Sequence, residues 1–331
     1  MPRALRFLWW NLDHLNHYDA TRAGEKNWPR SAAEHGAKRA AITQVLTAIA
    51  NDSGRPDLLA LCEVTRQAAI DLRDRLFPGY EVESFDLLAK SKANIALIFS
   101  RAVGFETVQQ LVVPCVPRTS RPMAVLDYRE PGHCIRFVAC HWPPQMSPTE
   151  DEYRGDAAKH LARHAFDFLT TEEAGIERHL VVLGDLNEEP FGMLERKLHA
   201  TRWRGRSLRA RHWADAEVKR VHLYNCAWRL LGEQAPHAGK RNELRLDAAG
   251  TYFYDGDGTW HTFDQVIVSG SLLGEVAPYL DEASLGVHPG ALLQCKNHLP
   301  QHFEWDDAEG KGLGVSDHLP VLGQLTLERS D

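Results

Sequence analysis

Five short apolar runs each lead into a polar side chain able to do chemistry, and a loop sets two more such side chains in front of the last apolar run. Runs this short and this apolar are typical of strands buried on both faces of a sheet. The polar residues come from both ends of the chain, so a single domain over residues 1–331 must fold both ends together. They are Asn11, Glu63, His141, Asp185 with Asn187, Asp264, and Asp317 with His318.

The clearest of these runs is Leu180–Leu183, a β-branched stretch that predicts a buried strand. Gly184 follows and allows the backbone either to turn or to approach a neighbour closely. If the extended geometry continues, the side chains of Asp185 and Asn187 point the same way, and Pro190 ends the strand. Taken alone, this stretch is explained equally well by a simple Asp/Asn turn without function. The other runs are therefore needed to decide between a turn and a functional site.

Predicted strands outnumber predicted helices, and long crossovers alternate with hairpin-like spacings. This pattern predicts an α/β protein in which two mixed β-sheets pack face to face with helices outside. Amphipathic helices are expected at Ser31–Ala50, Arg66–Phe77 and Glu152–Leu169. Strands are expected at Leu5–Leu12, Asp57–Val64, Tyr80–Phe85, Ala93–Ser100, Phe105–Val113, Met123–Tyr128, Cys134–Cys140, Leu180–Leu183, Thr251–Tyr254, Gln265–Ser269 and Val321–Leu327. An irregular, Arg- and Trp-rich insertion is expected at about 199–250, and Asp255–Gly258 is predicted to be a hairpin turn.

Composition excludes several classes of protein. No apolar run approaches the length of a membrane span, and the apolar patch Phe7–Leu12 is too short for the core of a signal peptide. The six Cys are scattered without a CxxC pair, which favours buried free thiols and a cytoplasmic location. A net charge of −7 argues against general coating of nucleic acid, yet it allows phosphate substrates if metal ions lie between carboxylates and phosphate.

If the strand ends converge, one pocket holds four carboxylates, two amides and two imidazoles. This set suits a hard divalent cation such as Mg²⁺ or Mn²⁺, which prefers oxygen ligands. It suits zinc poorly, because the chain has no HExxH motif and no Cys cluster.

Six segments resemble, in order, the successive motifs of the endonuclease/exonuclease/phosphatase superfamily with its DNase I-like fold. They extend from residue 10 to residue 320, and the closest likeness is to bacterial nuclease-like members. The resemblance implies a four-layer α/β sandwich and Mg²⁺-dependent hydrolysis of phosphoesters. The segments are Trp10-Asn11, Leu61–Val64, Cys140–Pro143, Gly184–Pro190, Phe263–Ser269 and Ser316–Pro320.

The resemblance also implies roles for single residues. Glu63 would bind the metal, with Asn11 and Asp317 helping directly or through water. The remaining roles are catalytic: Asp185 would orient and deprotonate the attacking water, and Asn187 would hold a phosphate oxygen.

Three further residues complete this implied set. His318 would donate to the phosphate while Asp264 holds its other ring nitrogen, and His141 would be a second imidazole at the phosphate. Taken singly, His141 is better explained as a satisfied core histidine, and a simple strand cap is an alternative explanation for Asp264.

The substrate is less constrained. Thr201–Trp213 contains five Arg and two Trp and no acidic residue, a composition that suits a phosphate backbone and stacked bases, with Arg204 and Arg206 as candidates. Arg118 and Arg121 are further candidates for gripping a phosphate. The alternative for all four is pairing with acidic residues at the surface.

We therefore expect a metal-dependent phosphodiester hydrolase that acts on nucleic acid, with DNA favoured over RNA as the substrate. We expect neither association with a membrane nor an obligate protein partner. A phosphatase, or a phosphodiesterase acting on phospholipids or inositol phosphates, is the alternative on the same fold. A non-catalytic binding module is disfavoured because no expected catalytic position is vacant. The first motif lacks the Asn-Gly of abasic-site endonucleases, and Thr262–Gln265 lacks the WxDR pattern of inositol phosphatases.

Overall fold

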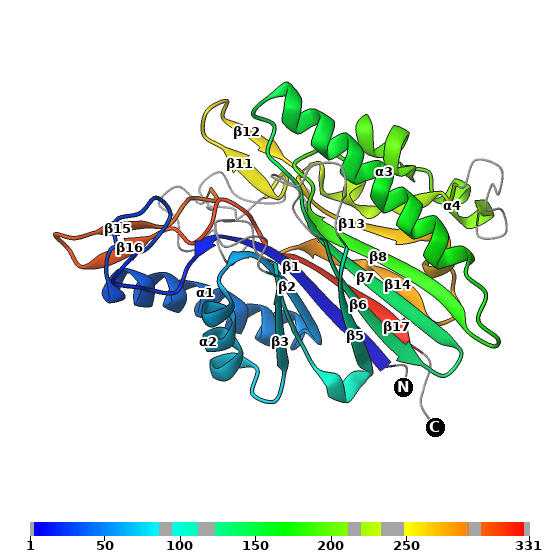
Figure 1. Cartoon of the computed structure of the whole chain (residues 1–331), viewed down its shortest axis with the longest axis horizontal. Coiled ribbons are helices and arrows are strands. Elements are labelled where there is room, and N and C mark those ends of the chain that lie inside the picture. Colours follow the sequence, from blue (N-terminus) through cyan, green and yellow to red (C-terminus); the bar gives the residue numbers. More distant parts are fainter. Residues whose placement is uncertain are drawn as a thin grey trace, which may run out of the picture.

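Two β-sheets stacked face to face form the centre of the protein, and helices cover their outer faces (Figure 1). This computed structural model describes residues 3–85, 95–111, 123–210, 220–232, 248–288, 290 and 299–327. The predicted α/β class with two packed mixed sheets and flanking helices is confirmed.

The first sheet joins the two ends of the chain. Its six strands lie in the order β14 (Tyr279–Val287), β17 (Val321–Leu327), β1 (Arg3–Leu15), β2 (Leu58–Val64), β4 (Ile95–Phe99) and β3 (Glu81–Phe85). β1 runs antiparallel to the last strand, with Trp9 opposite Val321, and parallel to β2, with Asn11 opposite Cys62. Because parallel strands end at the same edge, this pairing brings Asn11 close to Glu63, the residue after Cys62.

The second sheet supplies three of the predicted site residues in register. Its seven strands lie in the order β5 (Phe105–Leu111), β6 (Met123–Glu130), β7 (His133–His141), β8 (Glu177–Asp185), β13 (Asp264–Ser269), β10 (Leu223–Asn225) and β9 (Ala200–Thr201). Asp185 is paired with His141 on one side and with Asp264 on the other. Residues paired across neighbouring strands have side chains on the same face, so these three are adjacent by construction.

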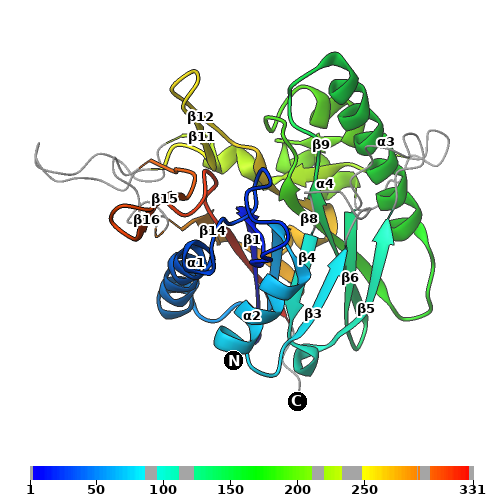
Figure 2. The same ribbon diagram turned by 60° about the vertical axis from the view of Figure 1, so that its left-hand side comes forward.

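Strand alternation separates the main core from the outer layers. In β1, Trp9 packs between the two sheets, whereas Trp10 packs under α1 (Ala32–Ser53) and α2 (Arg66–Leu76). In β8, Val181 faces the core between the sheets, whereas Val182 faces α3 (Pro148–Thr170). Both faces of β8 are therefore buried, as its continuous apolar run predicts. Figure 1 and Figure 2 show α1 and α2 on one side of the paired sheets and α3 on the other, which makes four layers.

The helices begin where the sequence provides caps. Ser31 accepts a hydrogen bond from the backbone N–H of Glu34 at the start of α1, and Ser147 does the same for Glu150 at the start of α3. Pro148 occupies the first turn of α3, where a missing N–H costs nothing.

Some elements were not predicted from the sequence. β14 escapes the pattern because it is an edge strand in which only Leu280 and Leu285 are buried. Two small hairpins project from the sheets. In the first, the predicted strand β11 (Tyr252–Tyr254) pairs with β12 (Thr259–His261), which was not predicted, and in the second, β15 (Glu304–Asp306) pairs with β16 (Lys311–Leu313), neither of which was predicted. The first encloses the predicted turn at Asp255–Gly258, which is confirmed.

The region expected to be irregular contributes to the second sheet. Besides β9 and β10 it holds α4 (Arg204–Ala210) and η3 (Cys226–Leu230), and the π-helical turn η2 (Leu194–Leu198) directly precedes it. Residues 211–219 and 233–247 lie outside the described residues. The four Cys that the structure describes are buried and free, and Cys115 and Cys295 lie outside it. None of the helices in the described part of the chain combines the length and apolar character that a membrane span needs.

Candidate active site

A cavity of about 550 Å³ opens where the ends of β1, β2, β7 and β8 meet the loop before β17. Seven of the eight residues predicted for catalysis and metal binding line it, and the eighth, Asp264, lies fully buried behind His318. The structure therefore brings these eight residues together. The seven are Asn11, Glu63, His141, Asp185, Asn187, Asp317 and His318.

Asp264 and His318 form a buried pair at the back of the cavity. Asp264 Oδ2 lies 2.7 Å from His318 Nδ1, and its Oδ1 accepts a hydrogen bond from Trp9 Nε1 at 2.7 Å. His318 Nε2 points into the cavity, 3.8 Å from Asp185 Oδ2 and 4.0 Å from Asp317 Oδ1. Burial alone would lower the pKa of His318, but the three surrounding carboxylates outweigh it and raise this pKa well above its usual value. The imidazole is therefore held protonated, with one N–H directed at the cavity.

Asp185 sits at the centre of the cluster. Its Oδ2 accepts a hydrogen bond from Asn11 Nδ2 at 3.1 Å and lies 3.7 Å from His141 Nε2. Burial raises the pKa of Asp185 to about 7; the charge of His318 opposes this rise and that of Asp264 adds to it. A carboxyl group with such a pKa exchanges a proton near neutral pH, as a general base must.

The chain turns sharply after Asp185. Asn187 adopts a left-handed φ of 48°, its backbone N–H donates to Asp185 Oδ1 at 3.0 Å, and its Nδ2 donates to Trp142 O at 2.9 Å. The extended geometry expected through Asn187 is thus replaced by an Asx turn, although both side chains still line the cavity. Gly184 allows a close approach, because a Cβ there would lie 2.2 Å from Cys140 O.

Glu63 and Asp317 form the acidic side of the cavity. Glu63 has a φ of 55°, a strained conformation for a residue with a side chain, of the kind found at functional sites. Its Oε1 lies 3.6 Å from His141 Nε2, and its Oε2 lies 2.6 Å from His14 Nδ1. Burial raises the pKa of Asp317. The charges of His318 and His302 oppose this rise, those of Asp13 and Glu63 add to it, and the net shift is upward. Negative charge at this edge is incompletely neutralised by the protein, so the donor set fits a hard divalent cation.

Sequence reasoning missed a group of residues beside the acidic side. Asp13 Oδ2 lies 3.0 Å from His302 Nδ1 and 3.5 Å from Lys38 Nζ, and His302 Nε2 lies 3.5 Å from Asp317 Oδ2. Asp13 and His14 follow Asn11 closely in β1, which was a usable signal. His302 lies in a loop before β15 and carries no sequence pattern.

Aromatic rings form a wall beside His318, and this too was missed. The ring centroid of Tyr252 lies 4.6 Å from that of His318 and 5.4 Å from that of Phe263, and the His261 and Phe263 rings stack at 4.8 Å. Tyr254 continues the stack from Tyr252 at 6.4 Å. All four aromatic residues line the cavity.

Of the four predicted substrate-binding arginines, the two that the structure describes do not lie at this wall. Arg204 Nε donates to Glu282 Oε1 at 2.8 Å, so this residue follows the acid-pairing alternative. Arg206 is exposed on α4, which packs near the Ser269 end of β13, whereas the cavity lies at the Asp264 end. Arg118 and Arg121 lie outside the described residues.

Two packed mixed sheets with flanking helices define a DNase I-like fold, and the cavity carries the acid and imidazole groups typical of hydrolases that act on phosphate esters. The chain belongs to the Endonuclease/Exonuclease/phosphatase family, which its sequence matches over residues 10–326. No curated protein matches the chain in sequence.

Solved structures extend this likeness to the whole chain. A family protein from Bacteroides thetaiotaomicron is 14% identical with a TM-score of 0.58, over 99% of this chain and 96% of that one. Truncated Caenorhabditis elegans TDP2 is 14% identical with a TM-score of 0.55, over 98% and 97%. A mannosyl-6-phosphatase from Bacteroides thetaiotaomicron is 13% identical with a TM-score of 0.56, over 98% and 100%. Identities this low establish a shared fold and leave the substrate open.

Proposed function

We propose that the protein is a Mg²⁺- or Mn²⁺-dependent phosphodiester hydrolase that cleaves nucleic acid, DNA in the first place. The observation that carries the proposal is the position of His318 Nε2, which faces Asp185 in the same cavity that Glu63 and Asp317 line. One face of a phosphate can then meet a proton donor and a base, and the other face can meet a cation.

Glu63, Asp317 and Asn11 would hold the cation, whose contribution when bound is to neutralise charge on the phosphate oxygens. Their oxygen donors and the raised pKa of Asp317 support this assignment. His14 touches Glu63 and would fix the orientation of its carboxylate.

The other side chains would act on the phosphate and the attacking water. Asp185 orients the water and accepts its proton, while protonated His318 donates to a phosphate oxygen. Asp264 keeps the His318 ring in place and charged. Asn187 and His141 supply further donors toward the phosphate oxygens.

The aromatic wall supports a substrate with planar rings. Tyr252 and Phe263 present stacked faces beside His318, and base–aromatic stacking contributes about 1–3 kcal/mol per base in proteins that bind single strands. A zebrafish TDP2 complexed with a single strand DNA product shares the fold, with 12% identity and a TM-score of 0.53, over 98% of this chain and 99% of that one. Together these points favour single-stranded DNA.

A phosphatase acting on a sugar phosphate is the second candidate. The same aromatic wall suits the apolar face of a sugar ring, and the structural neighbours include a mannosyl-6-phosphatase. Phospholipid and inositol phosphates remain further alternatives.

Hydrolysis assays separate these candidates. The protein is expected to hydrolyse bis-p-nitrophenyl phosphate with Mg²⁺ and to lose this activity in EDTA or as Asp185→Asn. Initial rates on single-stranded DNA, duplex DNA, RNA and mannose 6-phosphate then rank the substrates. Absence of any metal-dependent hydrolysis across the panel would reject the enzymatic proposal, and a preference for the sugar phosphate would replace the nuclease by the phosphatase.

A further inference from the structure

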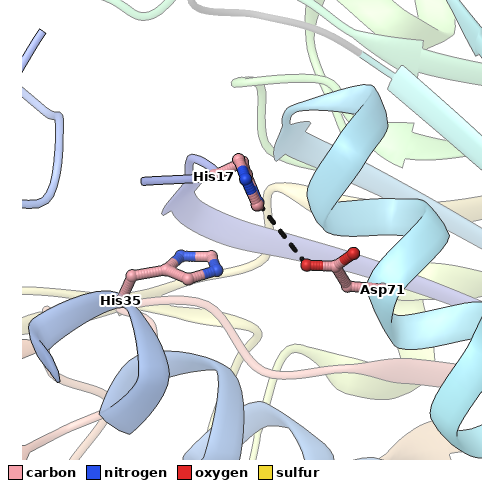
Figure 3. A group of neighbouring side chains, drawn as sticks. All are labelled: His17, His35 and Asp71. Atoms are coloured by element: carbon pink, nitrogen blue, oxygen red, sulfur yellow. Dashed lines mark ion pairs between the residues drawn. The ribbon is translucent and has the colours of Figure 1, made fainter. Parts of the chain in front are cut away.

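A second group of possible metal ligands lies away from the cavity. His17 from the segment after β1, His35 from α1 and Asp71 from α2 point toward one another (Figure 3). Their candidate ligand atoms all lie within 4.8 Å of one another, and His17 Nδ1 is 3.5 Å from Asp71 Oδ2. None of these three belongs to the described lining of the candidate active site.

His35 is the least satisfied member of the group. Its side chain is only 6% exposed, and neither ring nitrogen makes a well-formed hydrogen bond with the described residues, although the Asn16 backbone lies close. His17 Nδ1 is also buried, and its contact with Asp71 Oδ2 at 3.5 Å is too long for a well-formed hydrogen bond. Buried polar groups left in this state cost free energy and call for a partner.

The chemistry of His35 suits a metal ligand. Burial lowers its pKa, and the charges of Arg39 and His17 lower it further, so its imidazole is neutral at physiological pH. Metal ions bind the neutral imidazole.

We propose that His17, His35 and Asp71 bind one transition-metal ion of the zinc class, separate from the catalytic cation. Two imidazoles and one carboxylate form a common three-residue zinc set, with water in the fourth position. Donor atoms in a tetrahedral zinc site lie roughly 3.3 Å apart, so the His17–Asp71 spacing already fits, and the His35 nitrogen, within 4.8 Å of the other two atoms, would move closer on binding. Imidazole donors also select such ions against Mg²⁺.

The surroundings of Asp71 contain one supporting and one opposing group. Gln67 Nε2 donates to Asp71 Oδ1 at 3.0 Å and so orients the carboxylate from outside the set. Arg39 NH1 lies 3.3 Å from Asp71 Oδ2 and competes for the oxygen that would face the ion. Removal of this cation should therefore tighten metal binding.

The site would fasten the segment after β1 to both helices of the outer layer. The backbone N–H of His17 donates to Thr65 Oγ1 at 2.9 Å, and Thr65 is only two residues beyond Glu63. The ion would thus stabilise the strand end that carries Glu63 without entering the cavity, and its role is structural.

Zinc titration of the metal-stripped full chain in excess Mg²⁺ tests this proposal. The readout is the number of Zn²⁺ equivalents bound in isothermal calorimetry. His17→Gln, His35→Gln and Asp71→Asn are each expected to remove one equivalent, or to weaken it by about 100-fold or more. Arg39→Gln should tighten the same equivalent several-fold. Saturating Zn²⁺ should raise the Tm of the wild type but not of His17→Gln.

Two variants serve as matched controls. Asp185→Asn changes the candidate active site, and His133→Gln changes another His/Glu/His group, formed by His133, Glu177 and His179. Both should keep the equivalent that His17→Gln loses. The proposal is overturned if the wild type binds no Zn²⁺, if His17→Gln binds as the wild type does, or if either control loses the equivalent instead. His17 is half-exposed, so its variant remains informative even if His35→Gln does not fold.

Discussion

Replacement of Asp264 by Asn tests how the active-site imidazole is kept charged. The substitution preserves shape but removes a charge 2.7 Å from His318 Nδ1. At an effective dielectric constant of about 20, two unit charges at this distance attract by roughly 6 kcal/mol, part of which is offset because neither charge is solvated. Asp185 and Asp317 remain 3.8 and 4.0 Å from His318 Nε2, and their charges maintain part of the rise in the pKa of His318. We therefore expect the substitution to reduce the net stabilisation of the protonated imidazole by about 2 to 3 kcal/mol. This loss lowers the pKa of His318 by about 2.

The assay is the pH dependence of kcat/KM for bis-p-nitrophenyl phosphate. The imidazolium must donate, so activity falls as pH rises through the pKa of His318, and in Asp264→Asn this alkaline limb should move about two pH units lower. A shift of two pH units corresponds to a loss of rate that grows with pH and approaches, without exceeding, about 10²-fold. Asp127→Asn is the control, because Asp127 is also buried and paired with a cation, Arg136 at 2.7 Å, but lies outside the cavity lining. An unshifted alkaline limb in Asp264→Asn, or an equal shift in the control, would refute the reasoning.

Three further predictions follow from the geometry. Without metal, Asp185 has a pKa raised by burial, so the folded state binds more protons than the unfolded state between about pH 4 and about pH 7. Stability therefore falls as pH rises through this window, and Asp185→Asn should remove this dependence in urea titrations, with a gain of a few kcal/mol at pH 8; an unchanged pH slope would contradict this. Gly184→Ala forces a Cβ against Cys140 O and should lower the free energy of unfolding by about 2 kcal/mol or more in the same titrations, and an unchanged free energy of unfolding would contradict this. Tyr252→Ala should raise KM for single-stranded DNA about tenfold but leave KM for an abasic single strand, which has no bases to stack, nearly unchanged, and equal effects on both would argue against stacking.

The strand ends were predictable because a strand buried on both faces needs a continuous run of apolar residues, and such a run is visible in the sequence. The run before Asp185 is apolar on both faces, as the core between the sheets and the layer under α3 both require. Of its neighbours, His141 follows a similar run and Asp264 stands just before one, so the residues of the cavity could be chosen before the register was known.

Contacts made by loops could not be predicted in this way. His302 contacts Asp13 although the two residues are far apart in the sequence, and no pattern of apolar and polar residues indicates that they pair. Arg204 carries the composition of a phosphate-binding residue, but Glu282, 78 positions away, already engages it. Such pairings depend on where loops and edge strands pack against the two sheets. The preferences of single residues for helix or strand do not determine these positions.

The most direct test of the central claim is the position of a bound Mn²⁺ ion, located by its anomalous scattering in crystals of the protein. The account predicts one ion within coordination distance of Glu63, in the cavity that Asp185 and His318 also line. A saturating soak that places no ion at Glu63 would contradict it.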